Sequence, residues 1–372
     1  KFVFDVSHQT YAHKMLTGRK AGYYDDSRFS EDSGYTNPDE SEHDFFNIGH
    51  TSTSIALALG LAKGRDILGK KENIVAIIGD GSLSGGEALE ALSVAGSELN
   101  SNFIVVVNDN EQAIAENHGG LYKNLKALRD SNGKSENNMF RAWGLDYIYE
   151  ENGNDIASLI AVFEKVRDSN RPVVVHIHTQ KGKGYELAEK DKDFVEVTPA
   201  MPMSVGLGPE ERAQLGSQYI DTGIAEEAAV AIASGIARRG AKPLVVTNMT
   251  FLQRAYDQIS QDVCINKTPV TMLMNYSSFD GLTDVTHLGI FGLAAFTNIP
   301  NLVVLCPSSA EEYISMLDWS LDSKQKENPV LILIPGNDVS LRPADKDYGV
   351  LNRFKIEQKG EKVAIIALGD FF

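Results

Sequence analysis

The fold of this chain is decided by residues 72–112, ENIVAIIGDGSLSGGEALEALSVAGSELNSNFIVVVNDNEQ. The first apolar run, 74–78, stops at Gly-Asp-Gly, and the second, 103–107, stops at Asn-Asp-Asn. Between them, residues 86–99 carry alanine and leucine at helical spacing. The stretch therefore predicts a strand, a helix and a second strand parallel to the first.

Polar residues follow both of these strands. Because the carboxyl ends of neighbouring parallel strands form the ligand-binding edge of an open sheet, we expect Asp80 and Asn110 to converge. A carboxylate and a carboxamide oxygen are suitable ligands for Mg²⁺, which fills its other coordination positions with phosphate and water. Gly79 and Gly81 allow a diphosphate to approach the backbone at the N-terminus of the following helix.

Other interpretations of this loop fit less well. A dinucleotide fingerprint requires a third glycine where Ser84 stands, and a phosphate-binding loop of the NTPase kind requires a lysine after the glycines. A tight turn with a solvated Asp80 remains the plainest alternative for Gly-Asp-Gly alone.

Composition bounds the class of protein. The chain has 372 residues, of which 42% are hydrophobic and 23% charged, as in ordinary globular proteins. Its net charge of −16 argues against nucleic-acid and membrane partners, which require basic surfaces. No apolar run reaches membrane-spanning length. Cys264 and Cys306 lie in apolar segments, which predicts buried thiols in a reducing compartment such as the cytoplasm.

Several motifs together resemble the 1-deoxy-D-xylulose-5-phosphate synthase family of transketolase-type, thiamin diphosphate (ThDP) enzymes. Gly-Asp-Gly and Asn-Asp-Asn at this spacing resemble the ThDP fingerprint, and the run 250–258 is identical to the family motif. Ser7 stands where the family has glycine. The other matching segments are DVSHQTYAHK (5–14), ESEHD (40–44), GHTSTS (49–54), NEQAIAEN (110–117), TQKGKGYE (179–186) and IAE (224–226).

The resemblance implies roles for individual residues. Those implied to be catalytic are His8, Glu226 and His287. Those implied to bind ThDP are His8, Gly49, Ser52, Thr53, Gly79, Asp80, Gly81, Ser82, Asn110, Lys181, Glu226, Phe251 and Arg254. Those implied to bind Mg²⁺ are Asp80, Asn110 and the carbonyl of Gln112.

Glu226 is the residue on which ThDP chemistry depends in such enzymes. Its carboxyl group hydrogen-bonds N1′ of the aminopyrimidine, and burial would raise its pKa for that role. Phe251 would stack on the pyrimidine, and Lys181 would approach the thiazolium.

Each of these segments also has a structural interpretation. Glu226 would stabilise a helix dipole, the hydroxyl residues of 51–54 would cap a helix, and the basic run 181–183 would form a solvated turn.

The expected fold class is α/β, with two doubly wound parallel-sheet ThDP-binding domains and the start of a third. We place a diphosphate-binding domain at 1–192, a pyrimidine-binding domain at 194–345, and the beginning of a C-terminal transketolase-type domain at 355–372. Both ends of the chain fall in apparent strands, so we expect it to be part of a longer protein. The polar segment 122–138 is predicted to be a mobile loop.

The implied function is two-carbon transfer from pyruvate to an aldehyde, glyceraldehyde 3-phosphate in this family, by a homodimer. The substrate-binding positions depart from the family pattern. Basic or histidine residues of the family are absent from the Asn-Pro-Asp run 37–39, from Asn154 and Tyr276, and from the Ile-Pro-Gly-Asn run 334–337. Further departures fall at Glu227, Ala228, Asn248 and Thr283. One alternative is a ketol or acyl transferase acting on an unphosphorylated aldehyde. Another, from a different class, is a catalytically silent ThDP-binding protein.

Overall fold

The computed structural model forms two compact units, the first extending to Ala225 and the second beginning at Glu226. It describes residues 1–6, 8–112, 117, 119–180, 210, 215, 218–275, 277, 286–322, 328–334, 341, 359 and 361. Each unit is described by itself below.

The first unit is built on a sheet of parallel strands in the order β1-β2-β3-β5-β4. Its central strands are rich in valine and isoleucine and are buried on both faces, as parallel strands covered by helices require. Gly79 pairs with Asn108, so the carboxyl ends of β2 and β3 lie side by side. The strands are β1 (Phe2–Phe4), β2 (Val75–Gly79), β3 (Phe103–Asp109), β4 (Asp146–Glu150) and β5 (Pro172–His178).

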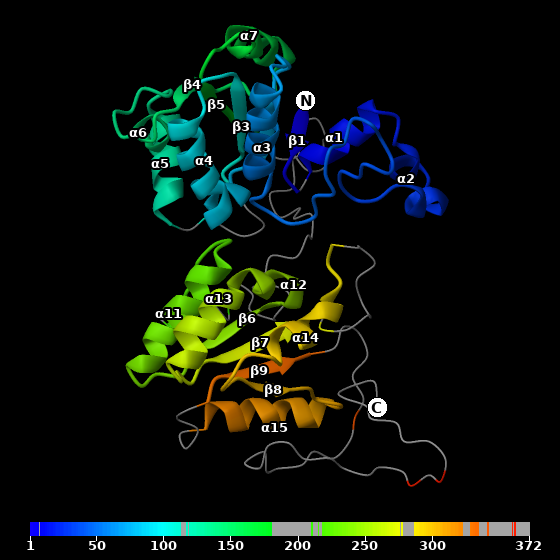
Figure 1. Ribbon diagram of the computed structural model, residues 1–372, viewed down its shortest axis with the longest axis vertical. Helices are drawn as coiled ribbons and strands as arrows, with labels where there is room; N and C mark the ends of the chain where they lie inside the picture. The colour runs from blue at the N-terminus through cyan, green and yellow to red at the C-terminus, as the bar shows by residue number, and fades with distance from the viewer. Residues whose placement is uncertain are drawn as a thin grey trace. The chain divides into compact units, whose positions relative to one another are not determined.

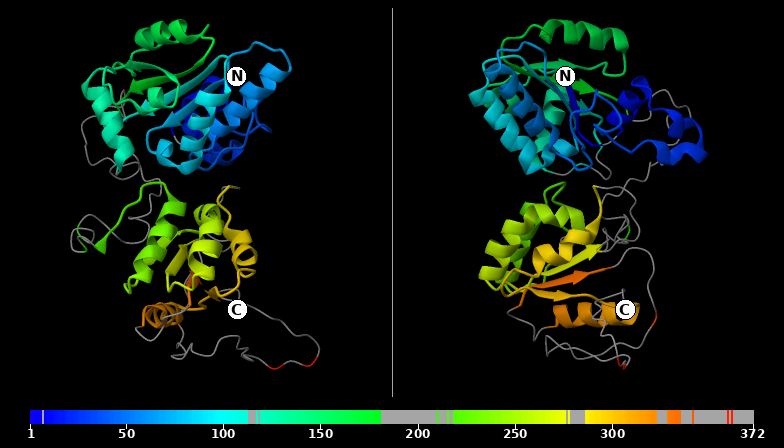
Figure 2. Two further views of the ribbon diagram at one scale, coloured as in Figure 1. Left: turned by 60° about the vertical axis from the view of Figure 1, so that its left-hand side comes forward. Right: turned by 45° about the vertical axis from the view of Figure 1, so that its right-hand side comes forward.

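Helices cover both faces of this sheet (Figures 1 and 2). Side chains of α3, α4 and α5 pack with Ala76 and Val105 on one face, and side chains of α7 pack with Val106 and Val175 on the other. The helices are α1 (Gln9–Leu16), α2 (Ala21–Tyr24), η1 (Asp26–Glu31), α3 (Ser54–Ile67), η2 (Ser82–Ser84), α4 (Gly86–Glu98), α5 (Gly120–Asp130), α6 (Met139–Ala142) and α7 (Ile156–Val166).

The predicted loop over 122–138 is wrong for its first half. Helix α5 occupies Gly120–Asp130, and α6 begins at Met139. Leu125 and Leu128 are fully buried against the sheet, and their spacing of three residues marks one face of the helix. Lys123, Lys126 and Asp130 of α5 are exposed, and tertiary burial of the two leucines outweighs the polar composition.

The second unit is another parallel sheet with helices on both faces, in the order β6-β7-β9-β8 within the described residues. Helix α11 packs with Met272 and Met274 on one face, and α15 packs with Leu273 and Ile332 on the other. The strands are β6 (Leu244–Asn248), β7 (Thr271–Asn275), β8 (Val303–Leu305) and β9 (Val330–Leu333). The helices are α11 (Glu226–Arg238), α12 (Met249–Leu252), η4 (Gln253–Ala255), α13 (Tyr256–Gln258), the π-helix η5 (Ile259–Ile265), η6 (Gly289–Phe291), α14 (Gly292–Phe296) and α15 (Ala310–Leu321).

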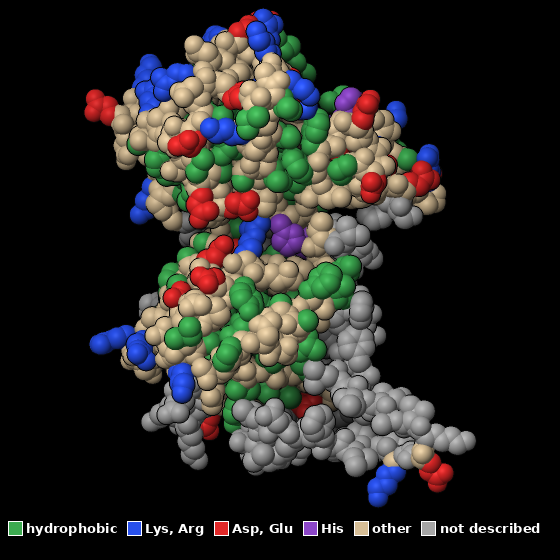
Figure 3. All heavy atoms as spheres, viewed as in Figure 1, with side chains coloured by type: hydrophobic (Ala, Val, Ile, Leu, Met, Phe, Trp, Pro, Cys, Tyr) green, Lys and Arg blue, Asp and Glu red, His purple; other side chains and the backbone are tan. Residues whose placement is uncertain are grey.

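The two doubly wound parallel sheets confirm the predicted fold class. The boundary predicted near residue 193 and nearly all of the third domain at 355–372 lie outside the described residues. No helix in the described part of the chain combines the length and apolar character that a membrane span needs. On the face shown in Figure 3, Lys and Arg side chains are scattered among acidic ones rather than gathered in one patch.

Candidate active site

The carboxyl edge of the first sheet brings the Gly-Asp-Gly and Asn-Asp-Asn loops together. The backbone N–H of Asp80 donates to the carbonyl of Asn108 at 3.1 Å, which extends the pairing of β2 and β3 by one residue. The backbone of Asn110 lies close enough to the Asp80 carboxylate to lower the pKa of that carboxyl group. Two segments that are thirty residues apart in the sequence thus meet where β2 and β3 end.

Asp80 is a buried carboxylate without a cationic partner among the described residues. Its side chain is only 2% exposed and accepts a hydrogen bond from Asn117 Nδ2 at 2.8 Å. Burial and the nearby charge of Asp109 raise the pKa of Asp80 to about 7. Asp80 makes no ion pair with any described residue. Because a buried charge requires compensation, this carboxylate fits a bound divalent cation.

The other predicted metal ligands form a tight turn. The Asn110 carboxamide oxygen accepts the Gln112 N–H at 3.1 Å, and Asn110 is half-buried. A carboxamide oxygen has two lone pairs, so this contact leaves one for a cation. Glu111 between them has a φ of 65°, in the left-handed region. The oxygen donors here are of the kind that Mg²⁺ selects.

The loop after β2 is built for close approach of an anion. Gly81 begins the short turn η2, whose first residue Ser82 is buried. Helix α4 begins one residue after Gly85, which has no side chain to cap the first N–H groups of the helix. A Cβ on Gly85 would lie 2.0 Å from Ser52 Oγ, so only glycine fits there. An uncapped helix N-terminus behind a glycine loop suits a diphosphate.

The segment 51–54 is anchored by Asp5, a residue that the sequence did not single out. Both Asp5 carboxylate oxygens accept backbone N–H groups, from Ser52 at 3.0 Å and from Ser54 at 3.1 Å. Thr53 is the N-cap of α3 but makes no side-chain capping bond, so Asp5 takes the place expected of the hydroxyl residues. Ser52 Oγ donates instead to the carbonyl of Ser82 at 2.7 Å. Gly49, three residues before Ser52, is buried.

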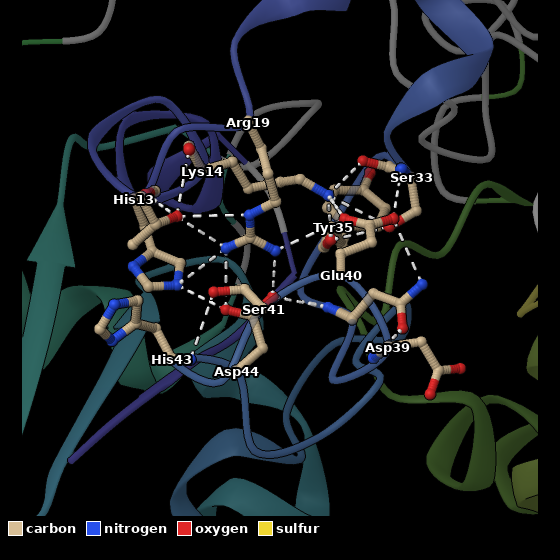
Figure 4. Close-up of polar contacts among 12 residues, drawn as sticks. His13, Lys14, Arg19, Ser33, Tyr35, Asp39, Glu40, Ser41, His43 and Asp44 are labelled. Atoms are coloured by element: carbon tan, nitrogen blue, oxygen red, sulfur yellow. Dashed lines mark hydrogen bonds and ion pairs between the residues drawn. The ribbon is translucent and has the colours of Figure 1, made fainter.

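The chain leading to Gly49 is held by a buried ionic cluster of His13, Lys14, Arg19, Glu40 and Asp44 (Figure 4). Lys14 Nζ, which is fully buried, lies 2.7 Å from Glu40 Oε2, and Arg19 Nη2 donates to Asp44 Oδ1 at 3.0 Å. His13 Nε2 lies 2.6 Å from the same Asp44 oxygen. His8 is half-buried at the N-cap of α1, the helix that carries His13 and Lys14.

In the second unit, the start of α11 and the residues after β6 form a second candidate cluster. Glu226 is half-buried at the first position of α11, where a helix dipole also favours an acid. Burial raises the pKa of Glu226, and the charge of Arg254 opposes that rise. The rings of Phe251 and His287 meet edge to face with centroids 5.6 Å apart. The structure therefore places Arg254 near Glu226, and Phe251 beside His287.

Asn248 adds a buried polar atom that has no partner among the described residues. It ends β6, is 2% exposed, and its carboxamide oxygen accepts no hydrogen bond from the described residues. Buried polar atoms are almost always satisfied. An unsatisfied acceptor at the carboxyl end of a parallel strand is therefore the kind of group that a ligand would satisfy. Sequence reasoning found Asn248 only as a departure from the family pattern.

Some predicted site residues cannot be placed. Lys181, Tyr276 and Thr283 lie outside the described residues. Conversely, Asp5, Asp109 and His176 were not predicted, although the structure buries all three completely at or beside strand ends. Position in the sequence was the only signal for two of them, because Asp5 directly follows an apolar strand and Asp109 ends one.

The two parallel-sheet units and the family models that match them make this chain a transketolase-type α/β protein. The model of the family described as 1-deoxy-D-xylulose-5-phosphate synthase matches residues 1–136 and 132–179, and that described as transketolase, pyrimidine binding domain, matches residues 184–340. The chain belongs to the 1-deoxy-D-xylulose-5-phosphate synthase family, which confirms the resemblance drawn from its motifs.

Curated relatives carry that name, and two of them serve as examples. The protein from Desulforudis audaxviator is 34% identical over 448 residues, covering 100% of this chain and 70% of the relative. The protein from Clostridium botulinum (strain Alaska E43) is 34% identical over 445 residues, covering 99% and 71%. The solved transketolase of Campylobacter jejuni is a distant structural neighbour, with 16% identity and a TM-score of 0.41 over 90% of this chain and 69% of that one.

Proposed function

We propose that this chain is a ThDP- and Mg²⁺-dependent transferase, a 1-deoxy-D-xylulose-5-phosphate synthase or close relative, which decarboxylates pyruvate and joins the two-carbon unit to glyceraldehyde 3-phosphate. Family membership over the whole chain supports the reaction class. The observation that carries the cofactor assignment is Asp80, a buried carboxylate without an ion pair among the described residues, beside the Asn110 turn.

The first unit, assigned here to residues 1–192, would hold the diphosphate end of the cofactor. Asp80, Asn110 and the Gln112 carbonyl would bind Mg²⁺. The backbone of the Gly79–Ser82 loop and the N-terminus of α4 would bind the phosphate oxygens. His8, Gly49, Ser52 and Thr53 are assigned to the same part of the cofactor on their family positions.

The second unit, assigned here to residues 194–345, would hold the pyrimidine end. When bound, ThDP supplies the electron sink that makes decarboxylation possible. The Glu226 carboxyl group would hold a proton at N1′ of the aminopyrimidine, a role that burial favours because it disfavours the charged form. Phe251, Arg254 and His287 would line this part, and Lys181 is assigned to the cofactor as well. We further propose a cytoplasmic homodimer, with residues 355–372 beginning a third domain.

Release of CO₂ from pyruvate tests this proposal. The full chain is offered pyruvate and a panel of short aldehydes, with ThDP and Mg²⁺ each present or omitted, and the products are identified by mass spectrometry. We expect CO₂ and a five-carbon ketose phosphate only when both cofactors are present. ThDP binding without any CO₂ release would instead favour the catalytically silent alternative.

A second candidate, transfer to an unphosphorylated aldehyde, is favoured by the charge of the substrate positions. The run 37–39 stands where the family carries a basic residue, and it ends in the exposed Asp39. The Asn154 carboxamide accepts the Gln180 N–H at 2.7 Å where the family carries histidine. A dianionic acceptor needs a local positive field. Asp39→Arg should then improve kcat/KM for the phosphorylated aldehyde selectively, whereas Asp168→Arg, at an exposed position of the same unit, should not.

A further inference from the structure

A buried carboxylate lies directly behind the predicted metal-binding turn. Asp109 ends β3, and its side chain is fully buried. Its Oδ1 accepts the backbone N–H of Glu111 at 3.0 Å, inside the turn. Its Oδ2 accepts hydrogen bonds from Arg129 Nη1 on α5 and from His176 Nε2 on β5, the latter at 2.9 Å. One side chain thus joins the turn 110–112 to two other elements.

The His176 ring is fixed from both sides. It is fully buried, and its Nδ1 lies 2.8 Å from the Tyr147 hydroxyl. Asp109 Oδ2 also accepts from Arg129, and a carboxylate oxygen has no hydrogen to donate. The hydrogen between Asp109 and His176 therefore belongs to Nε2. In the neutral ring, Nδ1 then accepts from Tyr147.

Arg129 also contacts the turn through the side chain of Glu111. Its Nη2 donates to Glu111 Oε2 at 3.0 Å, while Nη1 binds Asp109. Glu111, with its φ of 65°, has a backbone conformation that is unfavourable for any residue other than glycine. The hydrogen bond from its N–H to Asp109 and the ion pair of its side chain with Arg129 both offset this cost. Asp109 and Arg129 therefore hold Glu111, the residue between the two predicted ligands, in an unfavourable conformation, although neither of them binds the cation.

We propose that Asp109, His176 and Arg129 are positioning residues, which hold the turn 110–112 in the conformation in which Asn110 and the Gln112 carbonyl bind a divalent cation. The inference rests on the proposed function, which supplies Mg²⁺ as the cation. Residues that orient metal ligands commonly change metal affinity by about 10- to 100-fold when they are replaced. Replacing one of these residues should therefore raise the Mg²⁺ concentration that ThDP binding requires, and should not merely lower the stability of the chain.

The test measures the Mg²⁺ concentration that half-saturates ThDP binding to the full chain, by calorimetry, together with the free energy of unfolding in urea without ligands. Arg129→Lys keeps the charge, but one ammonium group cannot reproduce the two-pronged contact with Asp109 and Glu111. His176→Ala removes the donor to Asp109, whereas His176→Gln keeps an N–H near the position of Nε2. We expect the half-saturating Mg²⁺ concentration to rise about tenfold or more for Arg129→Lys and His176→Ala. His176→Gln should restore much of the response.

Arg65→Lys is the matched control. Arg65 is a buried arginine of the first unit, and it donates to the carbonyls of Glu72 and Asn102, just before the amino ends of β2 and β3. Its replacement should lower the free energy of unfolding as well. Because it acts at the opposite end of the same strands, it should leave the Mg²⁺ response at the wild-type value.

The outcomes separate this inference from the proposed function. If the wild-type chain binds ThDP in response to Mg²⁺, and Arg129→Lys and His176→Ala respond as the wild type does, the positioning role is overturned and the proposed function stands. If the wild-type chain shows no Mg²⁺-dependent ThDP binding, both fail. Should His176→Ala not fold, the comparison of Arg129→Lys with Arg65→Lys decides alone.

Discussion

The carboxylate of Asp5 accepts the backbone N–H of Ser52 at 3.0 Å and so joins the end of β1 to the start of α3. Ser52 has a φ of 77°, in the left-handed region. Its hydroxyl donates to the carbonyl of Ser82, so the same hydrogen-bonded network reaches the Gly-Asp-Gly loop. One buried acid therefore ties together segments that family position assigns to the cofactor.

Asp5→Asn should lower the free energy of unfolding by about 1–3 kcal/mol, the usual cost of leaving a buried polar group unsatisfied. One carboxylate oxygen becomes an NH₂ group that faces the N–H of Ser52 or Ser54. Urea unfolding measures the change, with Asp66→Asn as control, since Asp66 also accepts hydrogen bonds but is 34% exposed. Equal effects of the two substitutions would contradict the anchoring role of Asp5.

Asp80→Asn should stabilise the ligand-free chain while abolishing Mg²⁺-dependent ThDP binding. The substitution removes a buried charge that has no ion pair among the described residues and that Asp109 repels. Asp109→Asn is the contrasting variant. It breaks the contacts with Arg129 and His176, and breaking a buried pair costs about 3–5 kcal/mol. Urea unfolding and calorimetry measure both effects, and wild-type ThDP affinity in Asp80→Asn would argue against Asp80 as a ligand.

Glu226→Ala should still bind ThDP but should exchange the C2 proton of the cofactor about 10²–10⁴ times more slowly, the usual contribution of a positioned acid–base group. Glu227→Ala controls for helix charge, because Glu227 also lies in the first turn of α11. Exchange is followed by NMR in D₂O. Equal rates for Glu226→Ala and the wild type would reject the assignment.

The stability of the first unit should depend on Glu40 at acid pH. Burial would raise the pKa of Glu40, but hydrogen bonds from Lys14 and Ser33 lower it to about 2. A carboxyl group whose folded pKa is depressed contributes stability above its unfolded pKa, and that stability is lost as the pH falls toward the folded pKa. Between pH 6.5 and pH 3.5 the loss should be about 1 kcal/mol, given an unfolded pKa of about 4.3.

Urea unfolding of the wild type and of Glu40→Gln at these two pH values measures this contribution. The difference between the two proteins should shrink at pH 3.5. Asp130→Asn, which removes an exposed ion pair with Lys126, should show no such trend. A constant difference between the wild type and Glu40→Gln would contradict the ionic role of Glu40.

Much of the fold followed from sequence patterns. Continuous Val and Ile runs that end in Gly-Asp-Gly and Asn-Asp-Asn predicted parallel strands and the edge at which Asp80 meets the Asn110 turn. Helix α5 was missed because only Leu125 and Leu128 mark its buried face. Asp5 and Asp109 were missed for another reason. Their partners Ser52 and His176 are distant in the sequence, and no local pattern indicates which buried acid will accept which backbone or ring N–H.

The central claim is that the chain joins a two-carbon unit from pyruvate to an aldehyde by means of Mg²⁺ and ThDP. The most direct measurement incubates the full chain with ¹³C-labelled pyruvate and glyceraldehyde 3-phosphate and follows the label by NMR, with and without the two cofactors. The account predicts labelled 1-deoxy-D-xylulose 5-phosphate only when ThDP and Mg²⁺ are both present. Label remaining entirely in pyruvate, with this acceptor and with unphosphorylated aldehydes alike, would contradict it.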